Sequence, residues 1–300
     1  MRGFLVKLGG FVLTVAAGYF ALFLLVIALH VRAADKSCHL NENVSAVILG
    51  DSHMMWSIND AKIPNLRNIA LNAEGYKYSY LKLRRVLEQQ PQVKQVYLGA
   101  GFHNLSGYYD DYIFGGSFKF FAYRYLAVLS AEDYVELFTK DPLEFLRLTK
   151  HSIVEGFKPG LKGQCELYGT FPEEKQLQVY DPKSMEKRVQ SQFFDGEQLL
   201  GTSKSNLHFL KKITDLCEER GVALTLLNTP LHADYTARVP EPFQELLLNS
   251  VTSHGVGYYD FSELKLPDAA FLPDGDHLNS LGAQLTSDQF RSYHLAHIKN

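Results

Sequence analysis

The sequence predicts an α/β fold in which helices cover both faces of a parallel sheet of about five strands. Two observations lead to this prediction: short apolar runs recur along the chain, and amphipathic helical patterns lie between them. The chain has 300 residues, of which 46% are hydrophobic and 21% charged. It is therefore long enough for one domain with a sizeable core, and its composition is not that of a disordered chain.

The predicted strands and helices alternate as in a flavodoxin-like three-layer sandwich. The apolar runs that we interpret as strands comprise residues 45–49, 66–71, 93–98, 222–227 and 256–260. The helical patterns comprise residues 76–90, 205–220, 242–254 and 280–297.

Residues 106–200 interrupt this alternation and show no compact αβ pattern of their own. We therefore interpret them as an irregular insertion within a domain that covers residues 45–300. Two short helical patterns lie near residues 131–138 and 142–150. A stretch rich in glycine, proline and lysine at residues 156–175 predicts a loop.

Aromatic residues are densest at the start of this insertion, between Tyr108 and Tyr125. The chain has 17 Tyr and 20 Phe but a single Trp. Aromatic rings stack well on sugars, so these side chains could line a glycan groove. Alternatively they form the insertion's own core or rest on a membrane surface, which the excess of Phe over Tyr favours.

The N-terminal segment from Leu8 to Val31 carries no Asp, Glu, Lys or Arg over 24 positions. As a helix it would be about 36 Å long, enough to cross a hydrocarbon layer of about 30 Å. A cleaved signal peptide has a shorter apolar core, although the Val-Arg-Ala sequence at 31–33 keeps that alternative open. We expect residues 1–31 to form a cytoplasmic tip and a transmembrane anchor, and residues 32–44 a linker.

Flanking charges give a small bias in the orientation of this anchor. Arg2, Lys7 and the α-amino group precede it. Arg32 and Lys36 follow it and are offset by Asp35. The positive-inside rule then predicts a single-pass protein with a cytoplasmic N-terminus and an extracytoplasmic body, periplasmic or at the cell surface, with a cytoplasmic body as the alternative.

The charge balance and the cysteines exclude two classes of protein. With 30 Lys+Arg against 33 Asp+Glu, the net charge is −3, and no nucleic-acid partner is expected. Three cysteines are too few for a disulfide-built scaffold. Cys38 and Cys165 lie in polar surroundings, and Cys217 on the apolar side of a helical pattern. Either Cys38 and Cys165 form a disulfide, or all three thiols are free.

Polar residues follow the ends of predicted strands. Gly-Asp-Ser-His at 50–53 follows the first strand, and Gly-Phe-His-Asn at 101–104 follows the third. Asp-Gly-Asp-His at 274–277 precedes the last helix. A parallel sheet would bring these segments to one edge, where a serine, an amide and an Asp–His pair could carry out nucleophilic acyl chemistry.

Two of these segments resemble conserved blocks of the SGNH (GDSL-like) hydrolases and acyltransferases. Leu-Gly-Asp-Ser-His at 49–53 is similar to the first block, and the segment 274–283, with Asp-x-x-His and then Leu-Asn and Gly-Ala, is similar to the last. The resemblance covers about residues 45–105 and 205–295, and the two blocks are specific in combination.

This resemblance implies that Ser52 is the nucleophile, His277 the base, and Asp274 the residue that orients His277. A serine hydroxyl is a poor nucleophile until a base removes its proton. Histidine can take and return that proton near neutral pH, and a carboxylate on its other ring nitrogen fixes the tautomer.

The two blocks that supply oxyanion donors in this family match less well. Where the third block has Gly-x-Asn, this chain has His103, and Asn104 comes one position later. We favour Asn104 as the donor, with His103 as the alternative, because a neutral amide suits an oxyanion hole. The second block supplies a backbone N–H, from Ala73 or Gly75 here, beside the N–H of Ser52.

Other residues of the blocks have structural as well as functional interpretations. His53, His103 and His232 are possible substrate contacts, although His53 is more readily structural and His232 suits a protein surface equally well. Ser52 could instead cap a helix. Asp276 is expected to be a solvated or turn residue. No metal or other cofactor is expected, since no defensible ligand spacing, dinucleotide fingerprint or P-loop is present.

The resemblance implies ester hydrolysis or O-acyl transfer through an acyl-serine intermediate. Anchored members of the family often modify cell-envelope polysaccharides, so the implied substrate is a glycan or another ester. Acyl transfer would also need a membrane partner that exports the acyl group. The alternative is a non-catalytic SGNH-like binding or scaffold subunit of an envelope assembly, which the imperfect third block favours and the intact Ser52, Asp274 and His277 oppose.

Overall fold

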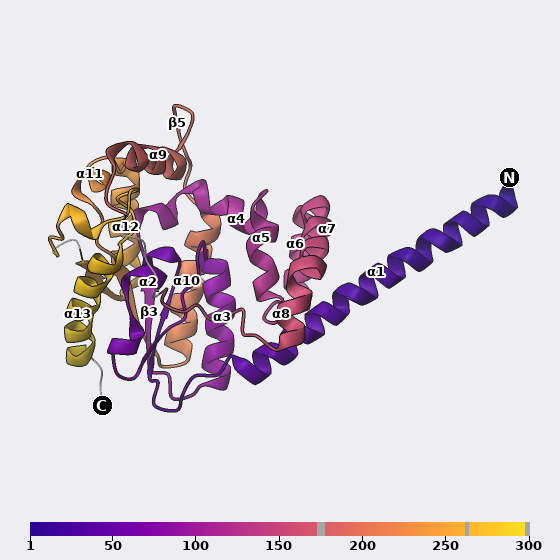
Figure 1. The fold of residues 1–300 in the computed structure, drawn as a ribbon, viewed down its shortest axis with the longest axis horizontal. Helices are drawn as coiled ribbons and strands as arrows, with labels where there is room; N and C mark the ends of the chain where they lie inside the picture. Colours follow the sequence, from indigo (N-terminus) through magenta and orange to yellow (C-terminus); the bar gives the residue numbers. More distant parts are fainter. Residues whose placement is uncertain (173–177, 262–263, 298–300) are drawn as a thin grey trace. The chain divides into compact units, whose positions relative to one another are not determined.

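The computed structural model describes residues 1–172, 178–261 and 264–297. The chain divides into two compact units. Figure 1 shows its helices and strands, with colours that follow the sequence. The first unit comprises Met1–His39 and Gly116–Glu166, and the second comprises Leu40–Gly115 and Leu167–Asn300.

The second unit is built on a five-stranded parallel sheet, as predicted. Its strand order is β2-β1-β3-β6-β7, and every neighbouring pair is parallel. The strands are β1 (Ala46–Leu49), β2 (Leu66–Asn68), β3 (Gln95–Gly99), β6 (Ala223–Asn228) and β7 (Gly257–Asp260). β1 pairs with β2 on one side and with β3 on the other, so the strand order of the sheet reverses at β1. Open α/β sheets form a crevice at such a switch point.

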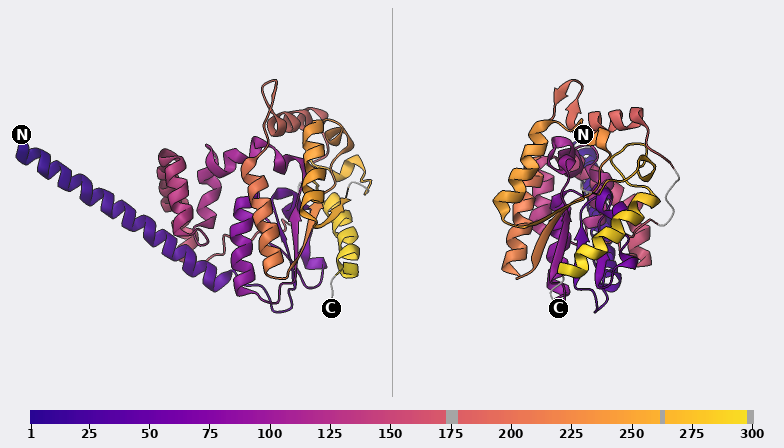
Figure 2. Two further views of the ribbon diagram at one scale, coloured as in Figure 1. Left: turned by 180° about the vertical axis from the view of Figure 1, so that it is seen from behind. Right: turned by 90° about the vertical axis from the view of Figure 1, so that its left-hand side faces the viewer.

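Helices cover both faces of this sheet, which makes it the middle of three layers (Figure 2). Alternate residues of β1 enter opposite cores: Val47 and Leu49 pack with one set of helices, Ala46 and Ile48 with the other. The first set is α3 (Tyr76–Gln89), α10 (Lys204–Glu219) and α12 (Glu241–His254). The second set is α2 (Ser52–Ser57) and α13 (Ser280–His297). The fold class predicted from the sequence is confirmed.

Shorter elements complete the second unit. They are η1 (Asp60–Lys62), η2 (Phe102–Leu105), η3 (Gly107–Tyr109), α4 (Asp110–Phe114), α9 (Pro182–Phe193), the hairpin strands β4 (Phe194–Asp195) and β5 (Gln198–Leu199), α11 (Ala233–Thr236) and η7 (Asp268–Ala270). Of these, α9 matters most for the site described below, and no helix was predicted there. Its start has a recognisable signal, because the Asp181 side chain caps the helix and Pro182 occupies its first turn.

The first unit joins the N-terminal helix to part of the predicted insertion. Its elements are α1 (Arg2–Ser37), α5 (Phe118–Ala122), η4 (Tyr123–Tyr125), α6 (Ala131–Lys140), α7 (Pro142–His151), the π-helical turn η5 (Ser152–Gly156) and α8 (Phe157–Lys162). Among the described residues, α1 is the one helix long and apolar enough to cross a membrane.

The prediction of a loop over residues 156–175 is wrong at its start, where α8 forms. Two of the four glycines that suggested a loop, Gly156 and Gly160, instead allow α8 and the preceding turn to approach α1 closely. A Cβ atom on Gly160 would lie 3.0 Å from the Cβ of Leu29, and one on Gly156 would lie 2.9 Å from Nε2 of His30. Residues 173–177 of the predicted loop lie outside the described residues.

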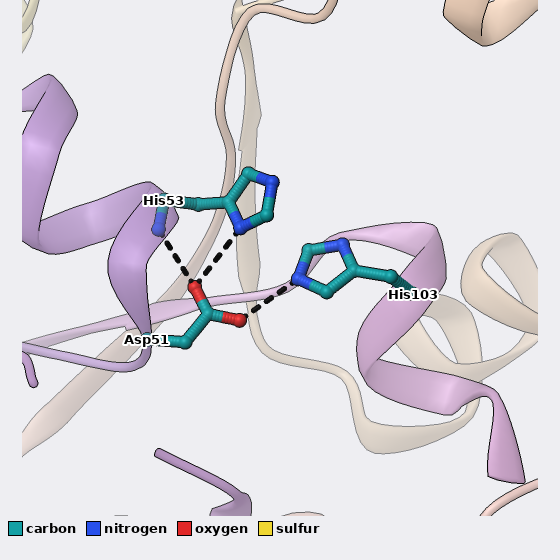
Figure 3. Close-up of side chains that lie close together, drawn as sticks. All are labelled: Asp51, His53 and His103. Atoms are coloured by element: carbon teal, nitrogen blue, oxygen red, sulfur yellow. Dashed lines mark hydrogen bonds and ion pairs between the residues drawn. The ribbon is translucent and has the colours of Figure 1, made fainter. Parts of the chain in front are cut away.

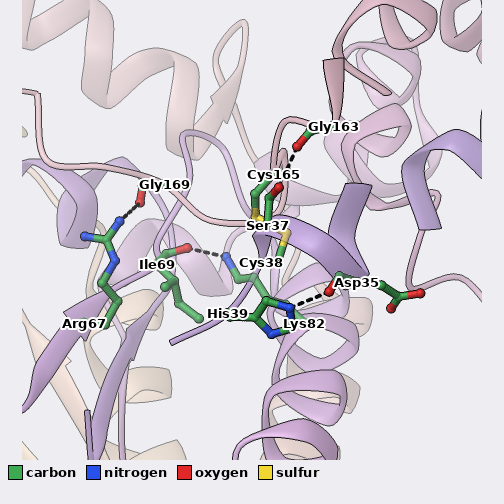
Figure 4. Close-up of a disulfide and its surroundings, with 10 residues drawn as sticks. All are labelled: Asp35, Ser37, Cys38, His39, Arg67, Ile69, Lys82, Gly163, Cys165 and Gly169. Atoms are coloured by element: carbon green, nitrogen blue, oxygen red, sulfur yellow. Dashed lines mark hydrogen bonds between the residues drawn. A yellow bond between two sulfur atoms is a disulfide. The ribbon is translucent and has the colours of Figure 1, made fainter. Parts of the chain in front are cut away.

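A disulfide joins Cys38 and Cys165, 127 positions apart in the sequence and both in the first unit (Figure 4). Cys217 is free and buried. Of the two alternatives open from the sequence, the structure confirms the first.

Candidate active site

Ser52 is the first residue of α2, directly after a sharp turn at the end of β1. Gly50 makes this turn with a φ of 128°, a conformation that side chains disfavour. A Cβ atom on Gly50 would also lie 3.2 Å from the backbone nitrogen of Gly99 at the end of β3. The helix cap is Asp51, whose side chain accepts from the N–H of His53, so Ser52 is not needed as a cap. Its hydroxyl is therefore available for another contact.

The structure brings Ser52, His277 and Asp274 into one hydrogen-bonded chain. The Oγ of Ser52 lies 2.8 Å from Nε2 of His277, and Nδ1 of His277 lies 2.7 Å from Oδ2 of Asp274. The other oxygen of Asp274 accepts the backbone N–H groups of Asp276 and His277. Burial opposes ionisation of Asp274, but the hydrogen bond and charge of His277 outweigh it and lower the pKa of this carboxyl. An ionised Asp274 holds a proton on Nδ1 and leaves Nε2 to accept one.

Two rings contact the imidazole of His277. The indole of Trp56, one turn after Ser52 on α2, lies 4.9 Å away between ring centres. The imidazole of His53 stacks on it at 4.6 Å and 25°. These contacts restrict the orientation of the His277 ring.

His53 is buried, and both of its ring nitrogens face carboxylates. Its Nδ1 lies 3.2 Å from Oδ1 of Asp51, and its Nε2 lies 2.8 Å from Oδ1 of Asp276. Two acceptors require both nitrogens to carry protons, so this side chain is an imidazolium. Burial works against the charge, but Asp276 and Asp51 together raise the pKa of His53 to about 10. Neither nitrogen is left for a substrate in this arrangement.

Asp51, the residue before the serine, is a buried carboxylate that accepts several hydrogen bonds (Figure 3). Its Oδ1 accepts from the backbone and ring of His53. Its Oδ2 accepts from Nε2 of His103 and Nδ2 of Asn104, each at 2.8 Å, and from the hydroxyl of Tyr109. Burial opposes the charge, but the two histidines hold the pKa of Asp51 well below its usual range. This carboxylate thereby connects the turn after β1 with the turn after β3.

His103 differs from its neighbour His53 in protonation. Its ring stacks on that of His53 at 4.0 Å, and its Nδ1 has no hydrogen-bond partner among the described residues. Burial and the charge of His53 lower the pKa of His103, against the attraction of Asp51. His103 is therefore a neutral donor to Asp51, and its ring is 2% exposed at most.

Asp276 is buried, contrary to the expectation of a solvated or turn residue. It accepts from Nε2 of His53, from Nε of Arg188 at 2.6 Å and from Nε2 of Gln192 at 2.9 Å. Burial opposes its ionisation, but His53 and Arg188 hold the pKa of Asp276 well below its usual range. Arg188 and Gln192 lie four residues apart on α9, and the sequence interpretation did not include either of them.

The candidate oxyanion residues are placed differently from one another. Asn104 uses its Nδ2 to hold Asp51, and its Oδ1 accepts the N–H of Gly101 at 2.7 Å, which leaves one Nδ2 proton. Ala73 has a φ of 57°, a left-handed conformation typical of glycine, and its N–H has no acceptor among the described residues. Gly75 has an ordinary φ of −75° and begins α3 as its N-cap.

A buried ion pair anchors the loop that carries Ala73. Glu74 and Lys82 are both fully buried, with Nζ of Lys82 2.5 Å from Oε2 of Glu74. The ammonium also donates to the carbonyl of Ile69, and Ser79 donates to the other carboxylate oxygen. Burial lowers the pKa of Lys82, and Glu74 offsets part of that effect. These contacts tie both ends of the loop to α3.

His232 lies beside the loop that carries Asp274 and His277, since its backbone N–H donates to the carbonyl of Gly275. Its ring stacks on Tyr180 at 3.6 Å and contacts Asp268 at 3.2 Å. It lines an open cavity of about 730 Å³ that includes Phe271. No contact of His232 with Ser52 is found among the described residues.

Two sets of side chains at this site have the atoms that bind transition metals. They are Asp51 with His53 and His103, and His53 with Asp276 and His277, with ligand atoms within 4.8 Å of one another. In both sets these atoms already make hydrogen bonds, within the set or, for His277, to Ser52 and Asp274. A metal would have to displace those bonds and the protons of His53.

No protein-family model matches the chain, and no curated protein matches it. Solved structures with similar folds include a GDSL-like lipase from Bacteroides thetaiotaomicron, 9% identical, covering 91% of this chain and 100% of that one with a TM-score of 0.44. A proposed acylhydrolase from Bacteroides fragilis is 9% identical, with coverages of 88% and 96% and a TM-score of 0.39. A proposed platelet-activating factor from Streptococcus pneumonia is 11% identical, with coverages of 95% and 98% and a TM-score of 0.35.

Proposed function

We propose that this protein hydrolyses or transfers acyl esters through an acyl-Ser52 intermediate, as an SGNH-type enzyme. The observation that supports this most directly is the hydrogen-bonded chain from Ser52 Oγ through His277 to Asp274. These three residues lie 225 and 3 positions apart in sequence, and the side-chain order is that of a nucleophile, a base and an orienting carboxylate.

In the first half-reaction, Nε2 of His277 takes the proton of Ser52 as Oγ attacks the ester carbonyl. Asp274 stabilises the resulting imidazolium. When the tetrahedral intermediate collapses, the C–O bond to the leaving alcohol breaks, and that alcohol takes the proton from His277. In the second half-reaction, water or an acceptor hydroxyl gives its proton to His277 as its oxygen attacks the acyl carbonyl. The bond between the acyl carbon and Oγ of Ser52 then breaks, and Oγ takes the proton back from His277.

The proposed oxyanion donors are the backbone N–H groups of Ser52 and Ala73 and the remaining Nδ2 proton of Asn104. Ser52 opens α2, so its N–H precedes the first hydrogen bond of the helix, at the end where the helix dipole favours negative charge. The N–H groups of Ala73 and Gly75 both lack an acceptor among the described residues, and we favour Ala73 because strained backbone of the kind it shows is concentrated at functional sites.

We further propose an extracytoplasmic location, with α1 as a single membrane span and a cytoplasmic N-terminus. The Cys38–Cys165 disulfide supports this location because such bonds persist in oxidising compartments. A membrane-held esterase or O-acyltransferase there would act on a cell-envelope polysaccharide or another ester. Transfer would need a membrane partner that exports the acyl group.

The experiment is turnover of p-nitrophenyl acetate by the full-length chain in detergent, with labelling by a serine-reactive fluorophosphonate. Ser52→Ala should lower kcat/KM by at least about 10³-fold and abolish labelling. Ser57→Ala, on the same helix, is the matched control and should retain both. The non-catalytic scaffold would be favoured if the wild type shows no turnover and no labelling, or if neither depends on Ser52. Mass spectrometry of envelope glycans from cells with wild-type or Ser52→Ala protein then tests the acceptor.

A further inference from the structure

The C-terminal part of the apolar segment of α1 is covered by helices of its own unit. Every side chain from residue 1 to 22 is exposed, whereas Phe23 and Val26 are buried. The ring of Phe23 packs edge-on against Tyr134 of α6 and Phe145 of α7, each at 6.3 Å. Figure 1 shows α8 beside the C-terminal half of α1, while the N-terminal half of α1 extends beyond α8.

The part of the apolar segment that is exposed at every position is too short to cross a bilayer alone. Leu8–Leu22 of the charge-free segment is exposed at every position, whereas beyond it exposed residues such as Leu24 and Leu25 alternate with buried ones. These 15 residues extend about 22 Å as a helix, against a hydrocarbon thickness of about 30 Å. If α1 spans a membrane, as proposed above, the remaining hydrocarbon surrounds the helices that cover residues 23–31.

Those helices carry apolar side chains suited to that environment. In α6, Val135 and Phe138 are three residues apart and therefore share a face, as do Leu143 and Leu146 in α7. With Val154 they are between 49% and 66% exposed. Large apolar side chains gathered in this way mark an interaction surface, and amphipathic helices of this kind lie at membrane interfaces.

A groove of about 590 Å³ lies between α1 and α7. Apolar residues between Phe11 and Phe20 form one wall, and Phe145 and Leu146 contribute to the other. The two hydroxyls in its lining, on Tyr19 and Thr149, bond each other at 2.6 Å. The groove thus offers apolar surface and satisfied polar groups, in the size range of small-ligand sites.

We propose that α6, α7 and α8 lie within the bilayer leaflet nearest Ser37, and that the α1–α7 groove holds a lipid acyl chain there. This inference rests on the proposed membrane span of α1. We assign an acyl chain as the occupant because the α1 wall of the groove belongs to the proposed membrane span, which lipid hydrocarbon would surround. Two ion pairs on these helices fit a shallow depth, since Lys140 and Arg147, which pair with Glu136 and Glu144, are long enough to reach headgroups.

The test measures the depth of single labels on the full-length chain in phosphatidylcholine–phosphatidylglycerol vesicles. An environment-sensitive fluorophore is attached to Leu146→Cys in the groove, Phe20→Cys on α1, or exposed Ser292→Cys on α13. Lipids with a nitroxide on the acyl chain should quench the labels at 146 and 20 several-fold more than the label at 292. Mass mapping of the 38–165 disulfide checks the fold of each variant, and unmodified protein checks that buried Cys217 does not react.

Two results would overturn the inference in distinguishable ways. In the first, the label at position 20 is quenched but the label at position 146 is quenched no more than the label at position 292. This result would keep the membrane span of α1, shifted toward the N-terminus, and would reject the embedding of α7. Such a water-exposed label at 146 is also what a protein partner for this surface would give in vesicles that hold the chain alone. Quenching at neither position would reject the span itself together with the inference.

Discussion

The imidazolium of His53 stacks at 4.6 Å on the imidazole of His277, the proposed base. A proton added to His277 therefore places a second cation against the first. Asp274 and Asp276 compensate, with Oδ2 of Asp276 3.9 Å from Nδ1 of His277. His53 thus opposes the positive charge that His277 gains when it takes the serine proton, while Asp274 stabilises that charge.

The first prediction concerns the pH dependence of catalysis in His53→Gln. Loss of the cation removes a positive charge beside His277 and leaves the carboxylates of Asp51 and Asp276 with their other partners, such as Arg188. We expect the acidic midpoint of the kcat/KM profile to move to higher pH, because a neighbouring cation is lost while the carboxylates remain. A merely structural role for His53 would lower activity without moving the midpoint.

His53 also predicts how stability changes with pH. Its pKa is raised to about 10 in the folded chain, above the ordinary value of 6.5. The stabilisation is therefore complete below pH 6.5 and is lost as the pH rises through about 10. Urea unfolding of the wild type should show falling stability over that window, with a smaller fall in His53→Gln. Nitrogen-15 NMR that finds His53 neutral at pH 8 would contradict both predictions.

Replacing Asp274 by Asn should lower activity, whereas replacing Asp276 by Asn should lower stability. Asp274→Asn should fold and lose about 10⁴-fold in kcat, because the His277 tautomer is no longer fixed. Asp276→Asn leaves the buried cation of His53 and the partly exposed cation of Arg188 short of an anion, which costs about 3–5 kcal/mol of stability. Circular dichroism melts and turnover of the two variants separate these effects, and equal melting points would refute the distinction.

The effects of Glu74 and Lys82 on stability should depend on each other. Lys82→Met leaves an uncompensated buried carboxylate and should lower the free energy of unfolding by about 3–5 kcal/mol. Lys82→Met combined with Glu74→Gln should recover much of that loss in urea titrations. A double variant as unstable as the sum of the single variants would show that the two charges do not depend on each other.

Ala73→Gly should stabilise the protein. The left-handed conformation costs an alanine about 1–2 kcal/mol, and glycine avoids this at an entropic cost of about 0.5–1 kcal/mol. The expected gain is up to about 1.5 kcal/mol. Turnover should be retained because the backbone N–H remains. Ala237→Gly is the matched control, since Ala237 has an ordinary φ of −63° and should lose stability.

The parts of this fold that periodicity encodes were predictable from the sequence. The five strands and the helices between them follow from apolar runs and amphipathic spacing, and the Asp274–His277 turn follows from a local motif. The buried role of Asp276 was not predictable, because it depends on Arg188 and Gln192, which α9 brings from 84 to 88 positions away. The helix α8 was missed because glycine signals flexibility locally, whereas here it permits close packing on α1.

The single Trp of the chain lies 4.9 Å from the His277 ring. An indole in contact with an imidazole changes its emission when that imidazole gains a proton, so the intrinsic fluorescence of the native protein is a label-free optical probe of His277. Acylation of Ser52, or an ester bound beside it, would alter the same signal. Stopped-flow emission could then time the formation and decay of the acyl-enzyme without any added chromophore.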